Sequence, residues 1–243
     1  MRIRYLTLVI AAGWLLSPGS AAQAQNKAAS LQSLSVAVSS TSAENLLRGD
    51  SPGWSQIAPK HVSLNRTPPL YDTDEPAALE IATVDVRCVR AQEKLIVQLS
   101  WRDPTRDATT LPEVPNTAPE TRFHKVQTEA DDRFFDAAAI MVPSRADEEI
   151  APSLQMGDAD HPVQIYYWNA TRGATLMEAR GRSTTRRTAQ TFPANSAYQN
   201  GQWNVTLELP NLRSGTLVAF AVWNGSQKDR DGRKYFSVWQ VLQ

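Results

Sequence analysis

The 243-residue sequence contains a single cysteine, Cys88, and this scarcity excludes several classes of protein. One cysteine cannot form an internal disulfide. Nor can it supply the several thiolates that an iron–sulfur cluster or a cysteine-based zinc site requires. The sequence has no C-x-x-C-H motif, so a covalently attached c-type haem is excluded as well. A metal or redox group in this chain would therefore need other ligands.

An excess of either charge is also absent, because 25 Lys and Arg residues balance 25 Asp and Glu residues. A nucleic-acid-binding domain would need a basic excess, so no nucleic-acid partner is expected. The one local basic run has Gly, Ser and Thr between its charges, and it predicts a solvated loop, with a docking patch as the alternative. Its members are Arg180, Arg182, Arg186 and Arg187.

Motifs for hydrolytic or zinc chemistry are missing too. There is no G-x-S-x-G, H-x-H or H-E-x-x-H. The three histidines, His61, His124 and His161, fall in unrelated loops and are interpreted as surface or structural residues. The chain is therefore not expected to be an enzyme by itself.

Only the N-terminus carries a long apolar run. Arg2 and Arg4 precede the apolar stretch from Leu6 to Leu16, and an A-x-A site ends at Ala24. This pattern is typical of a cleaved signal peptide, so residues 1–24 are predicted to be a Sec-type signal. No later segment approaches the ~20 apolar residues of a membrane span. The mature protein is therefore expected outside the cytoplasm, without a membrane span.

Strand periodicity dominates the rest of the chain. In residues 94–101 and 203–210, every second residue is large and apolar, which is the pattern of half-buried antiparallel strands. Residues 25–49 are rich in Ser, Ala and Thr and are predicted to be a flexible N-terminal arm. The stretch from Asp103 to Ala130 is predicted to be a long loop. We predict an all-β antiparallel β-sandwich over residues 50–243, with long loops and a few short helices.

Tryptophan is abundant, with seven residues in the chain. Trp168, Trp223 and Trp239 lie at or near predicted strand ends, where such side chains either pack a core or stack on a sugar or a planar cofactor. One functional hypothesis is thus a secreted carbohydrate-binding module in which exposed Trp168 and Trp223 hold a sugar.

Two further residues stand out by their setting. Met156 precedes a Gly-Asp turn, although a methionine side chain is most often core filler. Lys234 opens directly into the aromatic strand "YFSVW", where its amine would lie close to buried rings. The residues alone do not decide whether Met156 and Lys234 have a structural role or bind a ligand.

Four segments follow one another along the chain: "WRDPTRD", "FFDAAAIMVP", "LQMGDADHPVQIYYWNA" and "VAFAVWNGSQKDRDGRKYFSVW". In this order they resemble the haem b-binding γ subunit of ethylbenzene dehydrogenase. The family includes the corresponding subunits of periplasmic selenate, chlorate and dimethylsulfide-oxidising molybdoenzymes, and the resemblance runs from about Trp54 to Val241.

The resemblance implies a β-sandwich that holds one non-covalent haem b between axial methionine and lysine ligands. The motifs match these to Met156 and Lys234, with Lys228 a weaker alternative, facing each other across a pocket between the sheets. Trp168 is expected beside the cofactor and Arg233 at its propionates. An amine binds iron only as the free base, and with an ordinary pKa of ~10.4 its deprotonation at pH 7 costs about 4.6 kcal/mol. Iron coordination and burial must offset that cost.

The same resemblance implies a periplasmic, non-catalytic electron-transfer subunit. Its expected partners are a molybdopterin-containing catalytic subunit, an iron–sulfur subunit and, outside the complex, a soluble c-type cytochrome. Two protein ligands leave iron no open position, so a low-spin spectrum that carbon monoxide does not change is expected.

Overall fold

The computed structural model of the chain describes residues 31–68, 79–108, 134–145 and 150–243. The predicted signal peptide, residues 25–30 of the predicted arm and most of the predicted loop after Asp103 lie outside these ranges. Residues 32–243 cluster as one unit.

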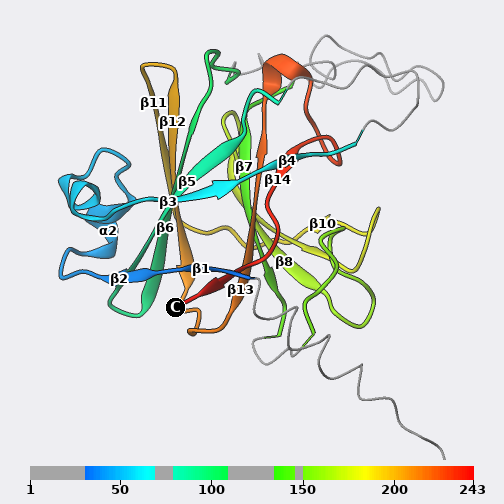
Figure 1. Cartoon of the computed structure of the whole chain (residues 1–243), viewed down its shortest axis with the longest axis horizontal. Helices are drawn as coiled ribbons and strands as arrows, with labels where there is room; N and C mark the ends of the chain where they lie inside the picture. The colour runs from blue at the N-terminus through cyan, green and yellow to red at the C-terminus, as the bar shows by residue number, and fades with distance from the viewer. Residues whose placement is uncertain (1–30, 69–78, 109–133, 146–149) are drawn as a thin grey trace, which may run out of the picture. The chain divides into compact units, whose positions relative to one another are not determined.

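Nine strands form the first sheet. They are β1 (Gln32–Leu34), β4 (Asn65–Arg66), β7 (Ala137–Pro143), β8 (Val163–Asn169), β9 (Gly173–Ala179), β10 (Arg186–Arg187), β13 (Leu217–Trp223), β14 (Tyr235–Phe236) and β15 (Gln240–Leu242). Their order is β1-β15-β13-β7-β8-β9-β10, while β14 pairs with both β13 and β4. Figure 1 shows β7, β8 and β13 at the centre of this sheet.

The second sheet has six strands. They are β2 (Val36–Val38), β3 (Lys60–Ser63), β5 (Thr83–Ala91), β6 (Lys94–Arg102), β11 (Ala194–Gln199) and β12 (Gln202–Pro210), in the order β11-β12-β6-β5-β2 with β3 also beside β5. Three short helices complete the described part: α2 (Ala43–Leu47), η1 (Pro52–Gln56) and η2 (Gly225–Gln227). The predicted all-β class is confirmed.

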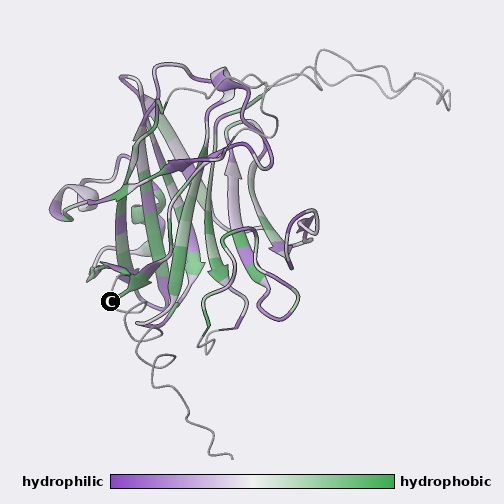
Figure 2. Cartoon of the chain, turned by 45° about the vertical axis from the view of Figure 1, so that its right-hand side comes forward, coloured by the Kyte–Doolittle hydropathy of each residue, from purple (hydrophilic) through white to green (hydrophobic). Residues whose placement is uncertain are grey.

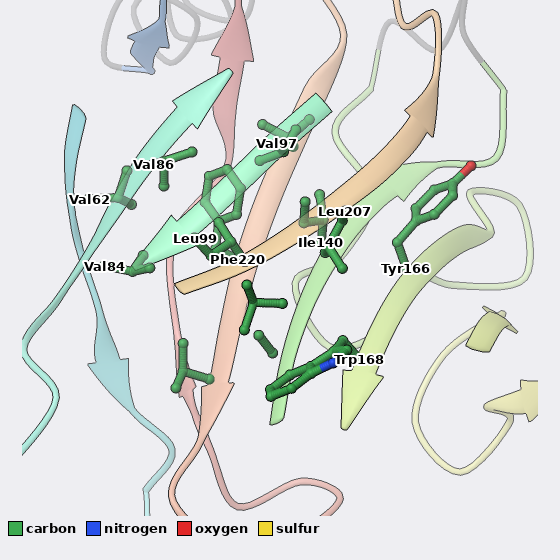
Figure 3. Packing of buried hydrophobic residues seen from close by; sticks show 14 of the residues in the cluster. Val62, Val84, Val86, Val97, Leu99, Ile140, Tyr166, Trp168, Leu207 and Phe220 are labelled. Carbon is green, nitrogen blue, oxygen red and sulfur yellow. The ribbon is translucent and has the colours of Figure 1, made fainter. Parts of the chain in front are cut away.

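The two sheets pack face to face through the residues that the alternation predicted. Leu95, Val97, Leu99 and Trp101 of β6 all belong to one buried cluster, which also contains alternate residues of β7, β8, β12 and β13. Figure 3 shows Val97 and Leu99 close to Ile140 and Phe220 of the opposite sheet. In Figure 2, the hydrophobic colour concentrates on the strands and the hydrophilic colour on the loops.

The segment before residue 50 differs from the predicted arm. From Gln32 onward it forms edge strands, with β1 parallel to β15 and β2 parallel to β5. Leu34 and Leu46 are fully buried, so even this Ser- and Ala-rich segment contributes apolar side chains to the domain. The sheets are therefore mixed rather than wholly antiparallel. A parallel pair needs a long connection, which the chain supplies between β2 and β5 and between β1 and β15.

The outer faces of the two sheets are covered differently. Ile96 and Val89 on the outer face of the second sheet pack against Leu46 of α2 and Trp54 of η1. The outer face of the first sheet instead carries the alanines Ala139, Ala219 and Ala221 at its centre. Loop residues such as Leu154 and Met156 cover it, and the candidate site lies there. No helix within the described ranges is long and apolar enough to cross a membrane.

Candidate functional site: a pocket on the outer face of the first sheet

A small apolar pocket lies on the first sheet. Its floor is made of the small residues Ala139, Ala219 and Ala221, whose side chains end at Cβ and so leave a hollow above the strands. Larger residues form the surrounding walls, namely Met141, Leu154, Met156, Ile165, Phe220, Trp223, Lys234 and Phe236, together with Ser237. Pockets that bind small molecules are commonly lined by apolar side chains with a few polar groups, as this one is.

The pocket lies on the outer face of the sheet. Side chains of consecutive strand residues point to opposite faces. Along β13, Val218 and Val222 belong only to the core between the sheets, whereas Ala219, Ala221 and Trp223 line the pocket. The prediction of a pocket between the sheets is therefore wrong. The physical reason is that β7 and β13 are covered on both faces, so alternation alone does not distinguish the inner face from the outer one.

Met156 enters the pocket from a tight turn ahead of β8. The Gly157 amide donates to the Ser153 carbonyl at 2.8 Å, and the Gly181 amide donates to the Met156 carbonyl at 2.8 Å. Met156 has a φ of 74° and Gly157 a φ of 73°, so two successive residues adopt the left-handed conformation. Non-glycine residues rarely do so, and such strain concentrates at functional sites. The backbone around Met156 is thus fixed from two sides.

Lys234 lies opposite Met156, as the sequence predicted for this pair. Its Nζ is 3.9 Å from the Met156 Sδ, although 78 residues separate the two in the chain. The same Nζ lies 5.5 Å from the centre of the Trp223 ring. A soft thioether and an amine therefore meet at the wall of an apolar hollow.

The surroundings favour the neutral form of this amine. Burial lowers the pKa of Lys234, and the nearby charge of Arg182 lowers it further, while Asp231 acts in the opposite direction. A neutral amine has a free electron pair for a metal ion, whereas an ammonium group has none. Deprotonation of Lys234, which binding to a metal ion would require, therefore costs less here than at an exposed lysine.

The pair has the spacing that a shared metal ion needs. Typical metal–sulfur and metal–nitrogen bonds, as found at zinc, are about 2.3 and 2.0 Å, so two donors on opposite sides of one ion lie about 4.3 Å apart. The observed 3.9 Å is a few tenths of an ångström shorter. Among the described residues, no group of three or more His, Cys, Asp or Glu residues could hold a metal ion. The donor set at Met156 and Lys234 fits a haem iron.

The other predicted site residues lie elsewhere. Lys228 is exposed and ends η2 in a left-handed conformation, outside the set of pocket residues. Arg233 is exposed as well, and its Nε lies 3.6 Å from the carboxylate of the buried Asp229. The structure thus brings neither of them to the pocket and identifies Lys234 as the lysine opposite Met156.

Trp168 lies on the inner face of β8. It packs against Trp203 and Trp101 in the core, with ring centres 5.1 and 6.5 Å away, and Figure 3 shows it among the core side chains. The tryptophan of the pocket is Trp223, which contacts Tyr167 edge to face at 5.5 Å. Trp168 and Trp223 are only 4% and 8% exposed, so neither offers the open ring face that the carbohydrate-binding hypothesis requires.

Sequence reasoning missed the alanines of the pocket floor. The signal was present, since "LVAFAVW" places alanine at every second position of an otherwise bulky strand and "AAAIMV" begins with three consecutive alanines. Ala139 and Ala221 are register partners on adjacent strands, so their small side chains make one continuous hollow. Alanines on two adjacent strands of an otherwise bulky sheet can thus indicate a ligand pocket.

Gly157 should be indispensable for the turn that carries Met156. A Cβ at this position would lie 2.5 Å from the His161 carbonyl oxygen, whereas Gly173 has almost the same φ and nothing within 4 Å. We expect Gly173→Ala to lower the free energy of unfolding by about 1 kcal/mol through backbone strain alone. Gly157→Ala should lower the free energy of unfolding by about 2 kcal/mol more than Gly173→Ala does, because the backbone atoms around the added Cβ must move. Urea unfolding of both variants checks this, and equal losses would contradict it.

Comparison with known proteins agrees with the family that the motifs indicated. The sequence profile of the family described as "Ethylbenzene dehydrogenase" matches residues 51–191, a range that includes Met156. Dimethylsulfide dehydrogenase subunit gamma of Rhodovulum sulfidophilum is 30% identical over 210 residues, covering 76% of this chain and 70% of that protein. Chlorate reductase subunit gamma of Ideonella dechloratans is 27% identical over 169 residues, or 64% and 62% of the two chains.

Two further proteins are similar to the chain. The Haloferax mediterranei protein named "Putative respiratory nitrate reductase heme subunit ORF7" is 29% identical over 214 residues, covering 81% of this chain and 70% of that protein. A family 9 carbohydrate binding module from Caldicellulosiruptor kristjanssonii, solved with glucose, has 12% identity and a TM-score of 0.41 over 86% of this chain and 85% of that one. That last likeness is too weak to bear on function. By its profile match and its relatives, the chain belongs to the ethylbenzene dehydrogenase family, together with the gamma subunits of dimethylsulfide dehydrogenase and chlorate reductase.

Proposed function

We propose that this chain is a non-catalytic electron-transfer subunit that binds one haem b, with Met156 and Lys234 as the axial ligands. The observation that carries the proposal is the 3.9 Å approach of the Met156 Sδ and the Lys234 Nζ at an apolar pocket. The relative from Haloferax mediterranei is named a heme subunit, which supports the same reading. When bound, the haem supplies one-electron redox chemistry.

The two ligands are suited to electron transfer. A thioether is a soft, neutral donor that favours ferrous iron and raises the reduction potential. The half-buried amine of Lys234 binds as the free base, which its lowered pKa favours. With both axial positions occupied by side chains, the chain leaves no open position for oxygen or a substrate, and only outer-sphere electron transfer remains.

The pocket walls suit a planar, apolar macrocycle. The alanine floor allows close approach to the sheet, and Trp223 and Phe236 offer aromatic surface at its sides. Because the pocket lies on the outer face of the sheet, one edge of the haem would remain near the protein surface. That position permits electron exchange with a docked partner.

We place the propionates near Arg182 rather than Arg233. Arg233 is directed to Asp229, whereas Arg182 follows Gly181, whose amide donates to the Met156 carbonyl. Arg182 is also the basic residue whose charge lowers the pKa of Lys234. An exposed guanidinium at this edge of the pocket can pair with a carboxylate in two-pronged fashion.

The substitution Arg182→Gln is expected to weaken haem binding modestly. Exposed ion pairs contribute roughly 0.2–1 kcal/mol, so the haem dissociation rate should rise by a factor of about 1.4 to 5. Arg186→Gln is the matched control, because Arg186 belongs to the same basic run but pairs with Glu178 at 3.0 Å. The rate of haem transfer to an apoglobin measures the effect, and equal rates in both variants would count against Arg182.

The family relationship supports a place in a multi-subunit enzyme. We propose a molybdopterin-containing catalytic subunit and an iron–sulfur subunit as partners within the complex, and a soluble c-type cytochrome as the external partner. The N-terminal pattern of residues 1–24 supports export to the periplasm through the Sec route. The N-terminal sequence of the exported protein would test the cleavage site after Ala24.

Titration of the mature chain with haemin tests the proposal. We expect saturation at one equivalent, with a Soret band that shifts on binding and a reversible one-electron reduction. Addition of soluble oligosaccharides should leave the tryptophan fluorescence unchanged. Failure to take up haem, or saturable sugar binding instead, would overturn the assignment.

A further inference from the structure

Lys234 lies where the regular hydrogen-bond pattern of its strand ends. β14 contains only Tyr235 and Phe236, which pair with Val222 and Ala221 of β13 on one side and with Arg66 and Asn65 of β4 on the other. Lys234 is one residue outside this ladder and follows the turn from Arg230 to Arg233. The sheet by itself therefore does not fix its backbone.

Thr67, the residue after β4, fixes that backbone instead. Its amide donates to the Lys234 carbonyl at 3.0 Å and its Oγ1 donates to the same oxygen at 2.8 Å. The Lys234 amide lies 3.2 Å from the Thr67 Oγ1 and donates to it. One threonine thus contacts both polar groups of the Lys234 backbone, and two of the three contacts depend on its hydroxyl.

The preceding residue holds the other end of the same loop. Arg66 donates through both terminal nitrogens to Asp229, at 2.6 and 2.5 Å, and its guanidinium lies 4.4 Å above the Tyr235 ring. Asp229 is fully buried and also accepts the Asn224 amide at 3.1 Å. Buried two-pronged pairs of this kind are strongly directional. The loop that leads from β13 to Lys234 is therefore tied to residues 66 and 67 at two points.

We infer that Thr67 is a positioning residue for the ligand lysine, holding the Lys234 backbone so that its amine stays directed at Met156. The inference rests on the proposed function, because it concerns the lysine as an iron ligand. Thr67 itself is outside the set of pocket residues and acts through the Lys234 peptide. Loss of its hydroxyl would remove two of the three hydrogen bonds that hold this peptide and let the amine leave the iron more often.

The chain offers a closely matched control for this idea. Thr188 makes the same double contact elsewhere, donating through its amide at 2.9 Å and its Oγ1 at 3.0 Å to the Leu176 carbonyl. Thr67→Val and Thr188→Val each replace a hydroxyl by a methyl group of similar size. The two changes should have similar effects on global stability, but only the first should change the haem.

The test is carbon monoxide binding to the ferrous, haem-loaded mature chain. Wild type and Thr188→Val should bind it very slowly, and Thr67→Val should bind it about tenfold faster, since each of the two lost hydrogen bonds is worth a factor of roughly three to five. Thr67→Ser, which keeps the hydroxyl, should restore the wild-type rate. If valine disturbs folding, Thr67→Ala carries the same expectation.

The outcomes separate this inference from the proposed function. A wild-type chain that takes up no haem, or binds carbon monoxide at once, contradicts the proposed function. A wild type that is inert to carbon monoxide together with an equally inert Thr67→Val overturns the role of Thr67 alone. Faster amide hydrogen exchange at Lys234 in haem-free Thr67→Val than in Thr188→Val would support that role without any haem readout.

Discussion

Replacing Lys234 by alanine is expected to turn an inert haem into one that binds carbon monoxide stoichiometrically. Lys234 supplies the one amine among the described residues that line the pocket, so alanine leaves Met156 as the single protein ligand. The iron then has one open axial position, which a small ligand can occupy. The ferric spectrum should change from low spin to predominantly high spin in the same variant.

The matched control is Lys228→Ala. Lys228 has the same charge and lies six residues earlier in the same loop, but it is exposed and outside the pocket. We expect its spectrum and its carbon monoxide reactivity to equal those of the wild type. If Lys228→Ala opens the iron and Lys234→Ala does not, the ligand assignment is wrong.

Replacing Asp136 by alanine is expected to cause the largest loss of stability in the described domain. This fully buried carboxylate accepts three N–H groups from distant segments: the Asp107 amide at 2.8 Å, the Trp203 Nε1 at 2.9 Å and the Gly225 amide at 3.0 Å. A buried donor that loses its partner costs about 1–3 kcal/mol, so the total loss should reach at least about 3 kcal/mol. That is a large share of the ~5–15 kcal/mol that stabilises a typical domain.

Asp50→Ala provides the comparison, because Asp50 forms only an exposed pair with Arg48 at 3.6 Å. Such pairs contribute at most about 1 kcal/mol. Urea unfolding of the two variants should therefore separate them clearly. A loss for Asp136→Ala no greater than that for Asp50→Ala would contradict the central role of this carboxylate.

The same residue should give the stability a dependence on pH. Burial, with a smaller effect from the nearby Asp103 charge, raises the pKa of Asp136 to about 7. Between the ordinary pKa of about 4 and this value, the folded protein retains a proton that the unfolded chain has lost. The contribution of Asp136 is thus fully present below pH 4 and declines as the pH rises to about 7. Asp136→Ala should lack this decline.

The fold class could be predicted because apolar residues recur regularly at every second position of β6 and β12, and only one face of each strand is strongly apolar. The Asn200–Gly201 turn between β11 and β12 was likewise recognisable, since both residues need a positive φ, observed at 53° and 70°. The N-terminal edge strands were not predictable, because each has only three residues and is stabilised by pairing with a distant strand.

The site could be predicted only in part. The motifs paired Met156 with Lys234 correctly in space, but the side of the sheet depended on β7 and β13, which are apolar on both faces. Trp168 was assigned to the cofactor from its place near a strand end. In the structure, its side chain lies on the face of β8 that points into the core, and Ile165 on the opposite face lines the pocket. The left-handed turn at Met156 and the contacts of Thr67 arise from tertiary neighbours that no local pattern records.

The axial pair is the central claim, and X-ray absorption at the iron edge of the haem-loaded ferric protein tests it most directly. We predict one sulfur and five nitrogen scatterers around the iron, four nitrogens from the porphyrin and one from Lys234. Met156→Ala should lose the sulfur, and Lys234→Ala should keep the sulfur and lose one nitrogen. A wild-type spectrum without sulfur, or one that neither substitution changes, would contradict the account.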